Sequence, residues 1–208
     1  MSQIQSNGHR VELLPMDRHF EEISVALYCN EAEHPTYRVH TYSQKSGSPG
    51  RLSFIRDAMV VLGDLEPVDE TRLRFPCGNR HEVAVKRVFL EACKLETGAD
   101  LTVRPLETLD KKSGLTMTVG ADEKGVYSVT ATGEGKNADR RVKVVAGGLV
   151  KLGEMEAIGE TSVKFPCGSR HDALAGVLLV RAPNVRAILR QDDAQASRGV
   201  LASPSQQN

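Results

Sequence analysis

The heptapeptide FPCGNRH at residues 75–81 occurs a second time as FPCGSRH at residues 165–171, with six of seven positions identical. At this offset of 90, residues 11–95 align with residues 101–185 without a gap. Eighteen of the 85 pairs are identical, about 21%, whereas ordinary composition gives roughly 6% by chance. Self-similarity at one fixed offset is typical of an internal repeat. We therefore predict that the chain is a duplication of a unit of about 90 residues.

The identical pairs are not confined to the motif, and they include aromatic, charged and small residues. The twelve pairs outside it are Pro15/Pro105, Glu33/Glu123, Tyr37/Tyr127, Val39/Val129, Arg51/Arg141, Val60/Val150, Leu62/Leu152, Gly63/Gly153, Glu66/Glu156, Glu70/Glu160, Thr71/Thr161 and Ala92/Ala182.

Both halves predict the same order of elements, β-β-β-α-β-α. Residues 9–14 and 101–106 are short apolar runs closed by proline, which indicates a first strand. Residues 24–28 and 36–42 predict a hairpin, whose turn corresponds to the clearer turn signal at 120–125. A first helix follows, because apolar residues recur every three or four positions. Its two stripes are Leu52, Ile55, Met59 and Leu62, and Val142, Val145, Leu149 and Leu152.

Gly63 and Gly153 follow these stripes, where a left-handed glycine often ends a helix. A short strand at 73–75 or 163–165 then leads into the motif, and a second helix follows it. Its stripes are Val85, Val88, Phe89 and Ala92, and Leu174, Val177, Leu178 and Ala182. Pro183 is expected to end the second of these helices early, and residues 185–189 to start a short extra helix.

These patterns predict an α+β protein of two tandem repeats. We expect a flexible N-terminus at residues 1–8, repeat 1 at 9–97, repeat 2 at 98–190 and a disordered C-terminal tail at 191–208. The joint at 98–100 is short, so the repeats are expected to pack as a pseudo-two-fold dimer.

The amino-acid composition limits the kinds of partner that we expect the chain to bind. Lys and Arg together number 27, as do Asp and Glu, so the formal net charge is zero. A neutral chain lacks the global field of a strong nucleic-acid or membrane-surface binder. No apolar run is long enough for a membrane span and no signal peptide is visible, so we expect a cytoplasmic protein. Four cysteines in a chain of 208 residues then indicate core thiols, metal ligands or reactive thiols.

The motif itself predicts a strand, a tight turn and a helix start. Proline fixes φ as the strand ends, and glycine permits a left-handed or closely approached backbone. Asn79 and Ser169 are suitable N-caps, which would put Glu82 and Asp172 in the first helical turn. The helix dipole accounts for those acidic residues, but not for the repeated Cys, Arg and His.

The first functional hypothesis is a metal site formed by Cys77, His81, Cys167 and His171. A separation of four residues puts Cys and His on one side of a helical turn. If the two motifs meet, the four side chains provide a Cys2His2 set for tetrahedral zinc. If they remain apart, each has two ligands, with His34 or His40 as candidates to complete it.

The second hypothesis is a small anionic-ligand or thiol-dependent site. A cysteine at a helix start beside Arg and His is where a thiolate is stabilised. The residues expected to bind the anion are Arg80 and Arg170, with the backbone of Gly78 and Gly168.

A third hypothesis is nucleic-acid binding through the basic residues Lys136, Arg140, Arg141, Lys143, Lys86, Arg87 and Lys94. Between residues 80 and 152 the predicted order α-β-β-β-α resembles that of double-stranded RNA-binding domains, in element order alone. A purely structural role is the remaining alternative, with Arg80 and Arg170 paired to Glu70, Glu160, Glu66 or Glu156.

Overall fold

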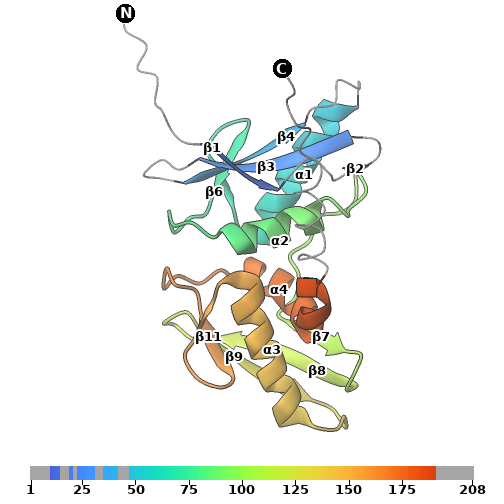
Figure 1. Cartoon of the computed structure of the whole chain (residues 1–208), viewed down its shortest axis with the longest axis vertical. Helices are drawn as coiled ribbons and strands as arrows, with labels where there is room; N and C mark the ends of the chain where they lie inside the picture. Colours follow the sequence, from blue (N-terminus) through green and yellow to red (C-terminus); the bar gives the residue numbers. More distant parts are fainter. Residues whose placement is uncertain (1–9, 15–18, 21–22, 31–34, 42–46, 191–208) are drawn as a thin grey trace, which may run out of the picture. The chain divides into compact units, whose positions relative to one another are not determined.

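The computed structural model describes residues 10–14, 19–20, 23–30, 35–41 and 47–190 (Figure 1). The predicted flexible N-terminus, disordered tail and residues 31–34 of the first hairpin turn, with His34, lie outside this range. The chain divides into two units, Met1–Val103 and Arg104–Asn208. Each unit combines an antiparallel sheet with two α-helices, which gives the α+β class. The pseudo-two-fold packing of the repeats stays a prediction.

Unit 1 contains a sheet with the strand order β1-β3-β4-β6-β5, and β2 also pairs with β3. Its elements are β1 (Arg10–Leu14), β2 (His19–Phe20), β3 (Ile23–Asn30), β4 (Thr36–Thr41), α1 (Ser48–Gly63), β5 (Glu66–Pro67), β6 (Arg72–Arg74) and α2 (Glu82–Ala92).

Unit 2 contains a five-stranded sheet with the order β10-β11-β9-β8-β7. Its elements are β7 (Glu107–Asp110), β8 (Leu115–Ala121), β9 (Val126–Thr132), α3 (Ala138–Gly153), β10 (Glu156–Ala157), β11 (Ser162–Lys164), α4 (Asp172–Arg181) and the 3-10 helix η1 (Ala182–Asn184). Residues 185–190 are helical, as the apolar spacing after Pro183 predicts.

Both units are two-layered, with the helices against one face of the sheet (Figure 1). Burial alternates along β8, where Leu115, Met117 and Val119 are buried while the residues between them are not. Successive side chains of a strand point to opposite faces, so one face forms the core. No helix among the described residues is long and apolar enough to cross a membrane.

The bounds of several elements differ by 90 residues between the units. The helices α1 and α3 start and end 90 residues apart, as do the strand pairs β5/β10 and β6/β11, and α2 and α4 start 90 residues apart. The first strand of the second half is the exception. Residues 101–106 are not a strand, and β7 at Glu107–Asp110 pairs with β8 instead. Pro105 has no N–H for a strand ladder, and β7 begins two residues after it.

Gly63 and Gly153 are not the left-handed caps that we predicted. Both are the last residues of their helices, and the following Asp64 and Glu154 have positive φ values of 56° and 53°. A Cβ at Gly63 would lie 2.9 Å from Val88 Cγ1, and one at Gly153 would lie 2.4 Å from Leu178 Cδ1. A side chain here would have to displace these residues of the second helix, so the close approach of the two helices favours glycine.

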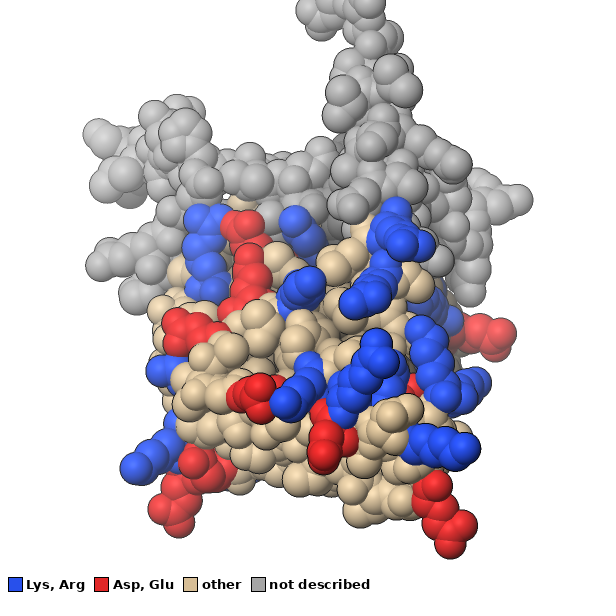
Figure 2. Space-filling view, turned by 60° about the horizontal axis from the view of Figure 1, so that its bottom comes forward, with Lys and Arg blue, Asp and Glu red and all other residues tan. Residues whose placement is uncertain are grey.

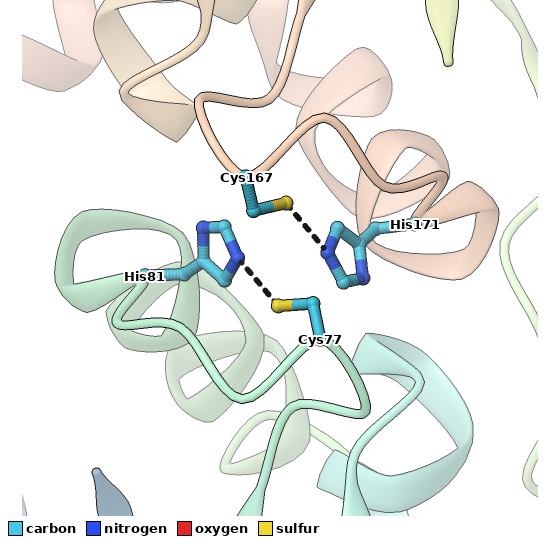
Figure 3. A group of neighbouring side chains, drawn as sticks. All are labelled: Cys77, His81, Cys167 and His171. Atoms are coloured by element: carbon cyan, nitrogen blue, oxygen red, sulfur yellow. Dashed lines mark hydrogen bonds between the residues drawn. The ribbon is translucent and has the colours of Figure 1, made fainter. Parts of the chain in front are cut away.

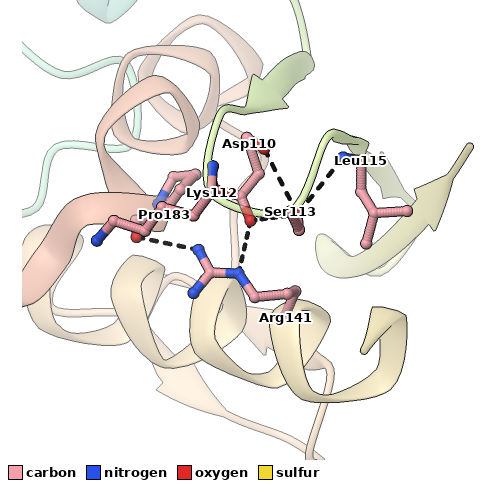
Figure 4. A network of polar contacts seen from close by, with 6 residues as sticks. All are labelled: Asp110, Lys112, Ser113, Leu115, Arg141 and Pro183. Atoms are coloured by element: carbon pink, nitrogen blue, oxygen red, sulfur yellow. Dashed lines mark hydrogen bonds and ion pairs between the residues drawn. The ribbon is translucent and has the colours of Figure 1, made fainter. Parts of the chain in front are cut away.

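Arg51 and Arg141 bind backbone carbonyls beyond the end of the second helix in their units. Arg51 is 3% exposed, and its guanidinium donates to Cys93 O at 2.9 Å and to Leu95 O at 2.6 Å. Arg141 donates to Pro183 O at 3.2 Å, the position 90 residues after Cys93 (Figure 4). A cation at a helix C-terminus satisfies orphan carbonyls and complements the dipole.

Arg141 also forms a salt bridge with Asp110, whose side chain is 1% exposed, with Nε–Oδ2 at 2.5 Å (Figure 4). Burial acts to raise the pKa of Asp110. Hydrogen bonds from Arg141, from Ser113 Oγ and from the Lys112 N–H outweigh it, so the pKa lies below its ordinary value. The folded state therefore favours the charged carboxylate at the turn between β7 and β8.

We expect Asp110→Ala to lower the free energy of unfolding by about 2–4 kcal/mol at neutral pH, because it leaves a largely buried guanidinium without its carboxylate. Because the pKa of Asp110 is lowered in the folded state, its carboxylate contributes its full stabilisation above the ordinary carboxyl pKa of about 3.9. It is lost as the pH falls through the folded-state pKa, so the difference between variant and wild type should shrink in acid. Urea unfolding followed by circular dichroism measures this in a chain without tryptophan.

The exposed Glu134→Gln is the matched control and should follow the wild-type pH profile. A pH-independent deficit in Asp110→Ala would contradict the assignment of the effect to the ionised carboxylate.

Candidate metal site

Each motif begins with a β-turn at the end of a core strand. Gly78 N–H donates to Phe75 O at 2.9 Å, and Gly168 N–H donates to Phe165 O at the same distance. Proline occupies the second position of each turn, which its fixed φ favours. The glycines have φ values of 72° and 74°, and a Cβ on either would meet no atom within 4 Å. The left-handed backbone, rather than crowding, therefore favours glycine here.

The turn aims a backbone N–H at each cysteine sulfur. Asn79 N lies 3.4 Å from Cys77 Sγ, and Ser169 N lies 3.4 Å from Cys167 Sγ. Each sulfur therefore accepts a backbone hydrogen bond from its own turn, which restricts its position. The thiolate is the form of cysteine that binds metals.

The same turn returns the chain so that a histidine lies beside each cysteine. Cys77 Sγ and His81 Nε2 share a hydrogen bond of 3.3 Å, and Cys167 Sγ and His171 Nε2 share one of the same length (Figure 3). The sequence-based pairing of these residues is thus found within each unit. The reason differs from our prediction, because the residues between Cys and His form a turn and a non-helical link rather than a helical turn.

A tyrosine of the central strand fixes each histidine backbone. The His81 N–H donates to Tyr37 Oη at 2.8 Å, and the His171 N–H donates to Tyr127 Oη at 2.6 Å. Burial raises the pKa of both phenols, outweighing the opposing effect of the histidine N–H, so both remain protonated at neutral pH. Each tyrosine therefore remains a neutral hydrogen-bonding group at the start of the helix.

A phenylalanine of the motif holds each imidazole ring edge-on. The Phe75 and His81 rings have centroids 4.8 Å apart at 85°, and the Phe165 and His171 rings are 5.1 Å apart at 89°. Both phenylalanines are fully buried, and the histidines are only 3% and 1% exposed. Packing restricts the rotation of each ring, which preorganises Nε2 toward the neighbouring sulfur.

The residues Cys77, His81, Cys167 and His171 together form a cluster that could hold a metal ion (Figure 3). One ligand atom from each residue lies within 4.8 Å of the others. The two histidines are buried and the two cysteines are half-buried. Two thiolates and two imidazoles are a donor set suited to tetrahedral zinc.

The anion-binding candidates Arg80 and Arg170 lie on the surface. Arg80 forms an ion pair with Glu82, and Arg170 Nη2 lies 2.5 Å from Asp172 Oδ2. The predicted partners at positions 66, 70, 156 and 160 are therefore wrong for these arginines. The hydrogen bond from Arg170 is the main cause that lowers the pKa of Asp172; burial opposes it and the Tyr127 hydroxyl assists it. Anion binding by Arg80, Arg170, Gly78 and Gly168 stays a prediction.

Asn79 and Ser169 are not the N-caps of the second helices. The caps are His81 and His171, neither of which forms a side-chain capping bond, and Glu82 and Asp172 are in the first turn as predicted. The Asn79 amide instead donates to Cys77 O, which stabilises the turn. The motif is extended between turn and helix, so the cap falls two residues later.

His40 is not part of the cluster. It lies in β4, where the alternate residues Tyr37 and Val39 point into the core, so His40 belongs to the opposite face of the sheet. Because side chains alternate between the two faces of the strand, His40 lies on the other side of the sheet from the Cys and His side chains of the motif.

Several residues of the basic stretches have structural partners. Arg141 binds Asp110, Lys143 binds Glu160, and Lys94 binds Glu91, while Arg87 is only 7% exposed. Figure 2 shows a face on which Lys and Arg lie interspersed with Asp and Glu. Nucleic-acid binding stays a prediction, and these pairings account for much of the pattern that suggested it.

No protein-family model, curated protein or solved structure matches this chain.

The structure adds Tyr37 and Tyr127 to the candidate site. The sequence contained a signal for them, because they are one of the identical pairs at the offset of 90. The hydrogen bond between each tyrosine and a histidine backbone could not be predicted, because the tyrosine lies in a strand 44 residues before that histidine.

We expect Tyr37→Phe and Tyr127→Phe each to lower the free energy of unfolding by about 1–3 kcal/mol, because a buried histidine N–H loses its acceptor. Tyr127→Phe should cost more, since its hydroxyl also donates to Asp172 at 3.0 Å. Urea unfolding followed by circular dichroism measures both. Ser128→Ala, which removes an exposed hydroxyl from the same strand as Tyr127, is the control and should change stability by less than about 0.5 kcal/mol. Tyrosine variants as stable as this control would refute the contact.

Proposed function

We propose that this chain is a zinc-binding protein in which Cys77, His81, Cys167 and His171 hold one structural ion. The observation that carries the proposal is the cluster of four donor atoms within 4.8 Å of one another. Four protein ligands complete a tetrahedral shell and leave no position for a substrate or reactive water. A closed shell favours a structural over a catalytic ion.

The spacing within each Cys–His pair supports shared coordination. Bond lengths of about 2.3 Å to sulfur and about 2.05 Å to nitrogen put two ligands of a tetrahedral zinc ion about 3.6 Å apart. The Sγ–Nε2 distance is 3.3 Å in both pairs, so only a small displacement is needed to admit an ion. In this arrangement Nε2 is the ligand atom and Nδ1 carries the ring proton.

The surroundings support the same assignment. Hydrogen bonds from backbone N–H groups restrict the positions of both sulfurs, and ring packing orients both imidazoles. Such outer contacts orient ligands and tune metal affinity. Duplication of an ancestral unit, as the sequence suggests, would explain how a half-site of two ligands came to be present twice.

Full-length protein purified without a histidine tag should contain about one zinc ion per chain by elemental analysis. The cobalt-substituted protein should show the intense visible absorption of a tetrahedral ion together with thiolate charge transfer. Two ions per chain would indicate separate Cys–His sites and contradict the shared one. The weak absorption of octahedral cobalt would contradict the closed shell.

Cys77→Ala and Cys167→Ala should each weaken zinc affinity by more than about 100-fold, because even outer-shell changes typically cost 10- to 100-fold. Cys29→Ala is the matched control, since Cys29 is fully buried in β3 and not in the cluster; its affinity should be unchanged. Circular dichroism should show the same secondary structure in all three variants. Equal losses in control and ligand variants would assign the effect to folding and refute the ligand roles.

A further inference from the structure

The four cysteines of the chain differ in their access to solvent. Cys29 and Cys93 are 0% and 1% exposed. Cys77 and Cys167 are half-buried, whereas their histidine neighbours are buried. A reagent dissolved in water therefore reaches the cluster from its sulfur side and meets these two cysteines before the other two.

The position of these two sulfurs favours oxidation to a disulfide. In the proposed zinc site both bind the ion as thiolates, and the thiolate is also the nucleophilic form of cysteine. Their Sγ atoms lie within 4.8 Å of each other, whereas a disulfide bond is about 2.05 Å long. The sulfurs must therefore approach by at most about 2.8 Å, a distance on the scale of side-chain rotation.

We propose that Cys77 and Cys167 are a site of oxidative modification, at which a peroxide links them in a disulfide and releases the zinc ion. The inference rests on the proposed zinc site. One thiolate attacks a peroxide oxygen, which breaks the O–O bond and gives a sulfenic acid and hydroxide. The second thiolate then attacks the sulfenic sulfur and expels a second hydroxide. Hydrogen peroxide accepts two electrons, one from each sulfur, and zinc keeps its oxidation state.

Release of the ion follows from the ligand count. A disulfide sulfur has no thiolate charge to donate, so the site retains only His81 and His171. Two neutral imidazoles are too few for a structural zinc site, which requires four ligands. A thiol reductant such as dithiothreitol regenerates both thiolates by exchange and restores zinc binding.

The test treats the zinc-loaded full chain with hydrogen peroxide in the presence of a chromogenic zinc chelator. Trypsin cleaves after Arg74, Arg80, Lys164 and Arg170, so the two cysteines fall in the short peptides FPCGNR and FPCGSR. We expect one zinc ion released per disulfide, and a linked FPCGNR–FPCGSR pair in the non-reduced digest. The chain should remain monomeric on a non-reducing gel, and dithiothreitol should reverse both changes.

Cys29→Ala/Cys93→Ala is the control and should release zinc at the wild-type rate. Zinc retained at peroxide doses that oxidise free thiols would overturn the proposal, as would links to Cys29 or Cys93, or links between chains. The zinc content before treatment separates the two claims. If the chain contains one zinc ion and retains it in peroxide, the oxidation site is refuted and the zinc site is supported. A chain that binds no zinc refutes both.

Discussion

The hydrogen bond from a histidine backbone to a strand tyrosine is the contact on which the candidate site most depends. It connects a core strand to the residue directly before a helix, 44 positions later in the chain, in both units. The bond fixes where the helix starts and therefore where the imidazole enters the core. The preceding turn positions the sulfur, which accepts a backbone N–H bond from within that turn. The imidazole is positioned by the tyrosine bond to its backbone and by the packing of a phenylalanine ring.

The pairing of Cys77 with His81 and of Cys167 with His171 could be predicted from sequence, because the same polar string occurs twice in segments that differ at most other positions. The local geometry could not be predicted. Asn79 was a plausible helix cap by residue type, but its amide binds the carbonyl of its own turn. Asn and Ser are favoured in turns and at caps for the same reason, hydrogen bonding to nearby backbone. Residue type alone therefore does not distinguish the two positions.

Residue identity at the offset of 90 was a better guide to structural constraints than residue chemistry. Arg51 and Arg141 carry the same charge as their basic neighbours, yet each binds carbonyls beyond a helix end. Gly63 and Gly153 follow the rule for helix caps, yet each is retained where a Cβ would clash with the second helix. In both cases the identical pair indicated that the residue type matters at that position. Which contact it makes depended on a partner about 25 to 44 residues away in sequence. A local sequence pattern gives no information on contacts between residues so far apart in the chain.

Sequence separation also decides what an ion at this cluster contributes. Cys77 and Cys167 are 90 residues apart, so an ion bound to both closes a long loop in the unfolded chain. On the chain-entropy model a cross-link of about 100 residues removes unfolded-state freedom that is worth about 4.7 kcal/mol, and the cost of closure rises only logarithmically with loop length. An ion held by Cys77 and His81 alone closes four residues and restricts little. Under the proposed shared coordination, metal binding would therefore stabilise the folded chain against unfolding, and this would be the physical advantage of two ligands in each half.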